Sequence, residues 1–385
     1  MSGFTILYVL LLVTMLSLLV AAHELGHFLF ARLFKMDVEE FAIGFGRPQW
    51  VYRVSKGTEY SLRPFPLGGF VRIKGMMPEE DGNEVNVPNG FYSKPPHQRF
   101  LVLLAGPVFS ILAGLAILIP LHTLYGIQTL GTTIDEVTKG SAAEQAHLIK
   151  GDKLLTFGNK PLVTFFDAIS YVRDKGGQPI PVTFRRNGAV LSTTVTPKLD
   201  DAPSDYLESI YAPTATRQVR QAKIGIRFSP QDRVLVQVPV GLAVQTALMW
   251  PVEMVKGLAG MVLRPSTFSQ NVGGPATIVT ESYAAAKNGW DSFLSMAALL
   301  SISLGIFNLL PLGPLDGGQM LIAVAEMFRK RRLSMNAQSA LAGIGTALLF
   351  MLIIGVVIVD VQRLMTPKQE SPTVSPPKSS SSSPR

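Results

Sequence analysis

Four long apolar segments constrain this chain more than any other feature, because each is near the ~20 residues that a helix needs to cross a bilayer. A lipid-exposed span satisfies its backbone polar groups as a helix or within a closed barrel, and segments this long and apolar favour the helix. The segments run over 4–30, 100–124, 290–312 and 340–361. The chain is 47% hydrophobic and only 16% charged, whereas soluble domains carry about 25% charged residues. These features predict a polytopic α-helical membrane protein with about four transmembrane helices.

The first apolar segment is expected to be a retained span and not a cleaved signal peptide. Met1-Ser2-Gly3 precede it directly, so it lacks a positively charged start. Its hydrophobicity also continues past Ala21 and Ala22, where a signal peptide would end.

Charge and cysteine content argue against several other classes of protein. The formal net charge is +8, but no basic helix or RNA-binding motif accompanies it, so we expect no nucleic-acid partner. The positive residues flank the apolar segments instead, as they do in proteins that contact a lipid bilayer. Because the chain has no cysteine, disulfides and cysteine-based zinc or redox sites are excluded.

The placement of Lys and Arg predicts how the spans are oriented. Positive side chains are frequent in the loop after the first span and in Arg329-Lys330-Arg331-Arg332, between the last two spans. The positive-inside rule places both loops in the cytoplasm. The N-terminus and the segment 126–288 are then expected on the outer side.

The expected domains follow from this orientation. A compact α+β domain occupies 128–198 on the outer side, with a hairpin that turns at Asn187-Gly188. We expect 240–263 to lie along the membrane surface, because a crossing there would reverse the third span. The full order is a first span at 1–30, a β-rich cytoplasmic loop at 31–99, a second span at 100–125, the outer domain at 128–198, a linker with peripheral amphipathic helices at 199–289, a third span at 290–328, a basic cytoplasmic loop at 329–339, a fourth span at 340–362 and a disordered tail at 367–385.

Three ionisable residues interrupt the first apolar segment, in the motif His23-Glu24-Leu25-Gly26-His27. Positions i and i+4 of a helix share a face, so His23 and His27 can bind one metal ion. Glu24 lies about 100° round from His23 and can act as a base. Ionisable residues inside an apolar span are costly and usually functional. The motif therefore predicts a zinc site, and the alternative is a polar trio bonded to neighbouring helices.

Asp316 is the expected third ligand, because a catalytic zinc takes three protein ligands and keeps one open position. It lies in the apolar sequence NLLPLGPLDGG, where Pro and Gly interrupt the helix. Non-helical backbone at membrane depth is tolerated around a site or cavity. If the first and third spans both run inward, His23 and Asp316 reach the same depth near the cytoplasmic face. The alternative is an acid at an ordinary helix boundary in the cytoplasm.

Asn308 precedes Asp316 in the same stretch and is the remaining polar residue of note. Its amide can donate a hydrogen bond to a developing oxyanion or hold the substrate backbone, as a catalytic residue would. It can also join helices to one another, as Asn does in membranes. Both roles stay open from the sequence.

The motif His23-Glu24-Leu25-Gly26-His27 together with 308–318 resembles the site-2 protease family. The chain is most similar to the bacterial regulator of sigma-E protease branch, over nearly all its length except the tail. The resemblance implies an intramembrane zinc metalloprotease of the bacterial inner membrane, with Zn2+ held by His23, His27 and Asp316. It also implies that Glu24 is the base and that Asn308 assists at the substrate.

The resemblance implies partners as well. Typical substrates of this branch are single-span membrane proteins, namely anti-sigma factors already trimmed outside and remnant signal peptides. The segment 128–198 resembles a PDZ domain, most clearly in KGDKLLTFGNKPL, so a peptide ligand is a further expected partner. The best-known members carry two tandem PDZ domains, but 199–289 is short and predicts helix and linker. We therefore expect one extracytoplasmic PDZ domain.

The cytoplasmic loop resembles the membrane-associated β-hairpin region of the family, in IGFGRPQW and RPFPLGGFVRIKG. An exposed strand edge can capture an unwound substrate segment by β-addition. We expect this edge at 65–70, and a purely structural hairpin is the equal alternative, because edge status cannot be read from sequence. The substrate-binding candidates are Gly44, Gly46, Phe65, Gly68, Gly69 and Phe70.

Two other functions fit parts of the sequence. A zinc transporter would place several His or acidic residues along a path across the spans, and the second and fourth spans are nearly devoid of them. A zinc-binding membrane scaffold that presents a PDZ domain would have no need of Glu24. A Glu24→Gln exchange therefore separates a protease from a scaffold.

Overall fold

The computed structural model describes residues 3–47, 49–55, 57–76, 87–173, 175–200, 221–263 and 272–365. The chain divides into two compact units. The first consists of Met1–Gly114 with Met254–Arg385, and the second is Leu115–Glu253. The expected disordered tail at 367–385 lies outside the described residues.

Four helices in the described part of the chain are long and apolar enough to cross a membrane, which confirms the predicted number of spans. α6 (Val240–Leu263) is not one of them, and its place at the membrane surface stays a prediction. The four spans are Ile6–Leu33 in α1 (Gly3–Leu33), Pro96–Tyr125 in and just after α2 (Pro96–Leu124), Trp290–Asn308, which is α9, and Asn336–Gln362 in α11 (Met335–Met365).

The expected third span at 290–328 is divided in the structure. α9 ends at Asn308, and α10 (Asp316–Arg329) begins after the non-helical residues 309–315. Pro311 and Pro314 lack the N–H groups that a continuous helix needs, so they favour this break. The predicted interruption of the helix before Asp316 is confirmed, whereas the predicted end of this span at 328 was wrong. The break places Asp316 at the first position of a new helix.

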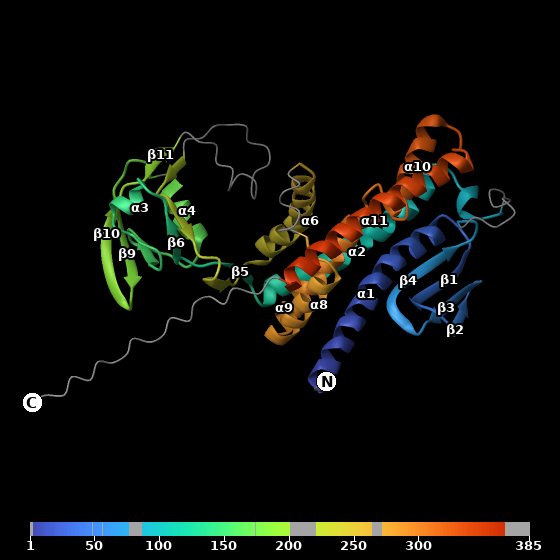
Figure 1. Cartoon of the computed structure of the whole chain (residues 1–385), viewed down its shortest axis with the longest axis horizontal. Helices are drawn as coiled ribbons and strands as arrows, with labels where there is room; N and C mark the ends of the chain where they lie inside the picture. Colours follow the sequence, from blue (N-terminus) through green and yellow to red (C-terminus); the bar gives the residue numbers. More distant parts are fainter. Residues whose placement is uncertain are drawn as a thin grey trace, which may run out of the picture. The chain divides into compact units, whose positions relative to one another are not determined.

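The β-rich part of the first unit is a four-stranded mixed sheet, which is larger than the predicted hairpin. Its strands are β1 (Val38–Phe45), β2 (Trp50–Ser55), β3 (Thr58–Leu62) and β4 (Phe65–Ile73), in the order β2-β3-β1-β4. β2 and β3 form the local hairpin, whereas β1 pairs parallel to β3 and antiparallel to β4. β4 is therefore an edge strand, and Figure 1 shows it beside α1.

A small apolar core holds the end of α1 against this sheet and the start of α2. The one glycine that most clearly serves this packing is Gly26 of α1, where a Cβ atom would lie 2.3 Å from the Ala105 carbonyl oxygen of α2. Small residues of this kind let membrane helices approach closely. The buried members of the core are Ala31, Met36, Val38, Ile73, Phe91, Val102 and Leu103.

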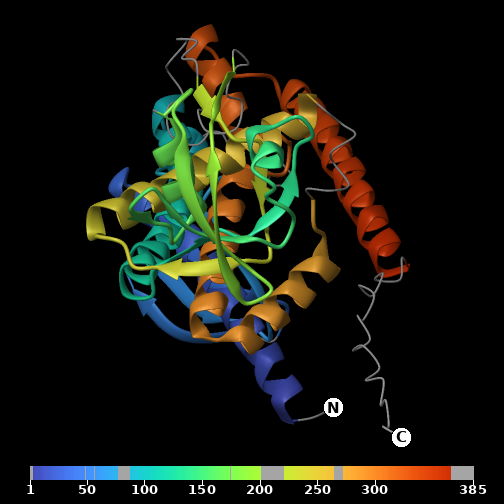
Figure 2. The same ribbon diagram turned by 90° about the vertical axis from the view of Figure 1, so that its left-hand side faces the viewer.

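The second unit contains a sheet in the order β10-β9-β7-β8. The predicted hairpin is confirmed, because β9 (Ile180–Arg186) and β10 (Ala189–Val195) pair antiparallel across Asn187-Gly188. Both turn residues have positive φ, 49° and 86°, as a type I′ turn requires. The hairpin is green in Figures 1 and 2. The other elements of this part are α3 (Ala142–Gln145), β7 (Lys153–Phe157), β8 (Lys160–Pro161) and α4 (Phe165–Arg173).

Strands within 221–236 complete this unit. The predicted end of the domain at 198 was therefore wrong, as was the prediction that 221–236 belongs to a linker. Ala222, Ile224 and Phe228 contribute to the same buried core as the segment 134–195. Two of the three strand pairs formed by this stretch join strands about 100 residues apart, and such pairs leave no local sequence pattern, which is why they were missed. The pairs are β5 (Ile127–Leu130) with β14 (Arg233–Val236), β6 (Ile134–Val137) with β13 (Ile226–Phe228), and β11 (Lys198–Asp200) with β12 (Gln221–Lys223).

The helical part of 199–289 also includes α8 (Pro275–Asn288), which begins at a carboxylate from another helix. Asp360 of α11 accepts hydrogen bonds from the backbone N–H groups of Gly274 at 3.0 Å and Ala276 at 2.9 Å. The first N–H groups of a helix have no partner within that helix. Asp360 therefore caps α8 and ties it to α11.

Candidate active site

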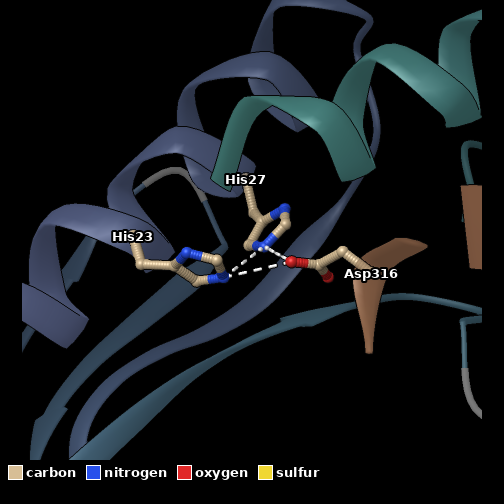
Figure 3. A group of neighbouring side chains, drawn as sticks. All are labelled: His23, His27 and Asp316. Carbon is tan, nitrogen blue, oxygen red and sulfur yellow. Dashed lines mark hydrogen bonds and ion pairs between the residues drawn. The ribbon is translucent and has the colours of Figure 1, made fainter. Parts of the chain in front are cut away.

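The structure brings the three expected metal ligands together. His23 and His27 lie one turn apart on α1, and Asp316 begins α10 (Figure 3). Their potential ligand atoms all lie within 4.8 Å of one another. Asp316 Oδ2 is 3.1 Å from His23 Nε2 and 3.4 Å from His27 Nε2. The two Nε2 atoms are 3.2 Å apart.

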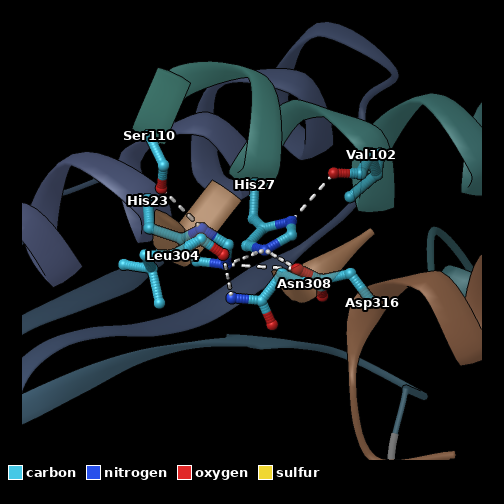
Figure 4. Close-up of polar contacts among 7 residues, drawn as sticks. All are labelled: His23, His27, Val102, Ser110, Leu304, Asn308 and Asp316. Atoms are coloured by element: carbon cyan, nitrogen blue, oxygen red, sulfur yellow. Dashed lines mark hydrogen bonds and ion pairs between the residues drawn. The ribbon is translucent and has the colours of Figure 1, made fainter. Parts of the chain in front are cut away.

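α2 orients both imidazole rings. His23 Nδ1 lies 2.9 Å from the Ser110 hydroxyl, and His27 Nδ1 lies 2.8 Å from the Val102 carbonyl oxygen (Figure 4). Because a carbonyl oxygen only accepts, His27 Nδ1 carries the proton of that hydrogen bond. The Nε2 atom of a neutral His27 ring then carries an unprotonated lone pair, which points toward Asp316.

This donor set fits a zinc ion. Asp316 Oδ2 is buried and has no hydrogen-bond donor among the described residues, although two imidazole nitrogens face it. Lone pairs that converge at this separation repel one another unless a proton or a cation joins them. Two imidazoles and one carboxylate are the ligand set of several catalytic zinc sites, and they leave a further position open.

Glu24, the expected base, lies close to both the metal ligands and the sheet. Its carboxylate interacts electrostatically with His23, His27 and Asp316, and it accepts a hydrogen bond from the backbone of Val71 in β4. A Cβ atom on Gly69 would lie 3.5 Å from Glu24 Cγ. The edge strand β4 therefore passes directly beside the side chain of this carboxylate.

Three residues of α2 that support the site were missed in the sequence. Besides Val102 and Ser110, these include Gly106, where a Cβ atom would lie 2.2 Å from His27 Nε2. Glycine is thus required where α2 passes the imidazole ring. The available signals were weak, namely a Gly-Pro pair and a lone Ser inside an apolar span.

Asn308 lies at the end of α9, near the three ligands (Figure 4). Its Nδ2 group donates to the Leu304 carbonyl oxygen at 2.9 Å, within the same helix. The amide is therefore held at the site by its own helix, and its role toward a substrate stays a prediction.

The expected substrate-binding residues gather along β1 and β4. A Cβ atom on Gly44, whose φ is +91°, would lie 2.7 Å from the Arg63 carbonyl oxygen, and Gly68 faces the Phe45 ring. Gly46 lies against the Phe65 ring, and Phe65 itself is 65% exposed. Phe70 is stacked with Phe45 and lies beneath the guanidinium groups of Arg63 and Arg72. These glycines permit close strand packing, while binding of a substrate stays a prediction.

Comparison with known proteins agrees with this geometry. Residues 11–352 match the model of peptidase family M50. A candidate zinc metalloprotease of Helicobacter pylori strain 26695 is 33% identical, over 92% of this chain and 99% of its own length. The candidate zinc metalloprotease Cj1068 of Campylobacter jejuni is 31% identical, over 92% and 93%. Metalloprotease MmpA of Caulobacter vibrioides is 30% identical, over 91% and 95%.

The site and the apolar helices thus define a membrane-embedded metalloprotease with zinc as its cofactor. The chain belongs to peptidase family M50, the family of site-2 proteases.

Proposed function

We propose that this metalloprotease cuts single-span membrane proteins within or near the bilayer, with zinc held by His23, His27 and Asp316. One observation carries the proposal. The Nε2 atoms of two histidines in an apolar span converge with Asp316 Oδ2 within 4.8 Å, beside the carboxylate of Glu24. Ionisable side chains inside an apolar span are costly and usually functional.

The chemistry requires a proton acceptor that is not itself a ligand. Zinc in such a site lowers the pKa of a water molecule to about 7 and so provides a nucleophile at neutral pH. The Glu24 carboxylate would accept a proton from that water molecule and donate it to the nitrogen of the leaving amine. Rotation of Asn308 away from the Leu304 carbonyl would free its Nδ2 group to donate to the developing oxyanion.

The substrate helix must unwind before its backbone is accessible, and β4 offers a partner for the unwound segment. β4 pairs with β1 on one side only, and Val71 of β4 contacts Glu24. A segment added along 65–70 would therefore approach the base. This placement supports substrate binding at Phe65, Gly68, Gly69 and Phe70.

The topology is part of the proposal. The positive-inside rule places the sheet and Arg329 to Arg332 in the cytoplasm of a bacterial inner membrane, with the active site near that face. The second unit, including 128–198, is then extracytoplasmic and acts as a PDZ domain for a peptide ligand. Substrates are pre-trimmed anti-sigma-type proteins or signal-peptide remnants.

A tagged single-span reporter, truncated on its outer side, tests the proposal. The reporter is co-expressed with the wild-type chain, with Glu24→Gln, or with Glu39→Gln as a matched control on the exposed face of β1. We expect a released cytoplasmic fragment on a blot with wild type and Glu39→Gln, and a loss of at least 100-fold with Glu24→Gln. Equal fragment from all three chains would remove Glu24 from catalysis and favour a zinc-binding scaffold.

A further inference from the structure

A cavity outside the active site lies where two of the apolar spans begin. Its volume is about 560 Å³, and it is lined by residues between 93 and 99 on one side and between 326 and 332 on the other. The spans Pro96–Tyr125 and Asn336–Gln362 start at these two borders. Figure 1 shows α10 close to the start of α2. The cavity therefore opens at the level of the membrane surface.

The lining of this cavity is strongly basic. Lys94, Arg99, Lys330, Arg331 and Arg332 border it, and Glu326 is the single acid. The carboxylate of Glu326 forms an ion pair with the Arg99 guanidinium and accepts a hydrogen bond from the backbone N–H of Leu333 at 3.0 Å. The other positive charges therefore have no compensating carboxylate in the lining. A cavity of this kind attracts anions.

Arg99 provides a buried donor at the cavity. Its side chain is only 2% exposed, and its Nε atom has no hydrogen-bond partner among the described residues. Buried donors without a partner are rare. α2 begins beside this group and has no acidic residue in its first turn, and helix N-termini favour negative charge. Two independent features thus point to an anion at the same place.

α10 also exposes an apolar face, on the side of the helix away from the basic lining. Phe328 is 85% exposed and Leu321 is 47% exposed. They lie seven residues apart and so share one face of α10, roughly opposite the face of Glu326 and Lys330, which line the cavity. α10 ends at Arg329, and Lys330 follows it with a left-handed φ of 53° that turns the chain into Arg331 and Arg332. The apolar face of α10 therefore turns to the lipid while its basic end borders the cavity, so the anions nearest to this cavity in a membrane are lipid headgroups.

We propose that this cavity binds the phosphate headgroup of an anionic phospholipid from the surrounding leaflet. Basic pockets between membrane helices have the chemistry for such headgroups. Lys94, Lys330 and Arg331 pair with the phosphate. The site is distinct from the metal ligands and holds α10, which begins with Asp316, against the start of α2.

Native mass spectrometry of the full chain in detergent tests this site, with dioleoylphosphatidylglycerol as the probe and dioleoylphosphatidylcholine as the neutral comparison. We expect one tightly bound phosphatidylglycerol molecule per chain and weaker binding of phosphatidylcholine. The double variant Lys330→Gln with Arg331→Gln removes two charges and should weaken binding about 30-fold. Lys94→Gln should weaken it about fivefold. The matched double control is Lys35→Gln with Arg53→Gln, at two other exposed positions of the first unit.

The outcomes separate a built site from general surface charge. Unchanged binding by the control pair, together with loss in the Lys330 and Arg331 pair, supports the proposal. Equal loss in both pairs would overturn it, as would equal affinity for the two lipids. Displacement of the lipid by millimolar inorganic phosphate would also overturn it, because the ligand would then be a free anion. Zinc content of each variant confirms that the chain is folded.

Discussion

At the scale of single residues, α2 decides which ring nitrogens face Asp316. Ser110 and the Val102 carbonyl hold the two Nδ1 atoms, so both Nε2 atoms point to the third ligand. Groups that hydrogen-bond a metal-binding histidine fix its tautomer and ring orientation. Ser110 is fully buried, and this hydrogen bond explains a hydroxyl inside an apolar span.

Ser110→Ala should weaken zinc binding by about 10-fold to 100-fold, because His23 then loses the partner that orients its ring. Competition with a zinc-binding dye measures the affinity of the purified chain. Ser295→Ala is the matched control, since the Ser295 hydroxyl donates to Asp291 O within α9. Equal zinc affinity in wild type and Ser110→Ala would show that Ser110 does not orient the ligand.

At the scale of elements, the four-stranded sheet contains a buried carboxylate at its centre. Glu40 of β1 is 4% exposed and accepts hydrogen bonds from Ser61 of β3 and Arg63. Burial alone would raise the pKa of Glu40, but the hydrogen bonds from Ser61 and Arg63 and the charge of Arg63 lower it below its usual value. This carboxylate joins β1 to β3, the parallel pairing that no local pattern predicts.

The lowered pKa of Glu40 gives a signed pH dependence. A carboxylate with a lowered folded-state pKa stabilises the fold above its unfolded pKa, about 4.3, and loses this contribution as pH falls through the folded value. Wild type should therefore unfold at a higher temperature than Glu40→Gln at pH 7, and the gap should narrow below about pH 4. Scanning fluorimetry from pH 3 to 8 measures this difference in unfolding temperature.

Glu39→Gln serves as the control for that series, because Glu39 is exposed on the other face of β1. Its unfolding temperature should follow wild type at every pH. A gap between wild type and Glu40→Gln that is constant over the whole range would contradict the assignment to ionisation of Glu40.

At the scale of the whole molecule, the proposed metal ligands come from opposite ends of the family match. His23 and His27 lie on the first span, and Asp316 follows the third. A zinc ion on these residues therefore closes a very long loop of chain. Any ligand that binds only the folded state stabilises it, by about 4 kcal/mol at a thousand times its dissociation constant.

Removal of zinc should therefore lower the unfolding temperature of the chain. We expect a chelator to shift wild type downward and added zinc to restore it, while Asp316→Asn should show little response to either. Differential scanning calorimetry in detergent measures both. An equal chelator shift in Asp316→Asn would mean that the stabilising metal lies elsewhere.

Local properties of the sequence were enough to predict the membrane class, the number of apolar spans and the residues proposed to bind zinc. These follow from local properties: apolar length, the four-residue spacing of His23 and His27, and the cost of an acid such as Asp316 in apolar sequence. The hairpin at Asn187-Gly188 was also predictable from local sequence, because an Asn-Gly pair by itself favours a type I′ turn.

The contacts between segments far apart in the sequence, by contrast, depend on tertiary packing. The parallel pairing of β1 with β3, the return of 221–236 to the second unit and the support of His23 by Ser110 all depend on chain segments that no periodic pattern connects. The same holds for Gly106, whose missing side chain makes room for His27. Periodicity reports which face of an element is buried, and packing alone determines what that face meets.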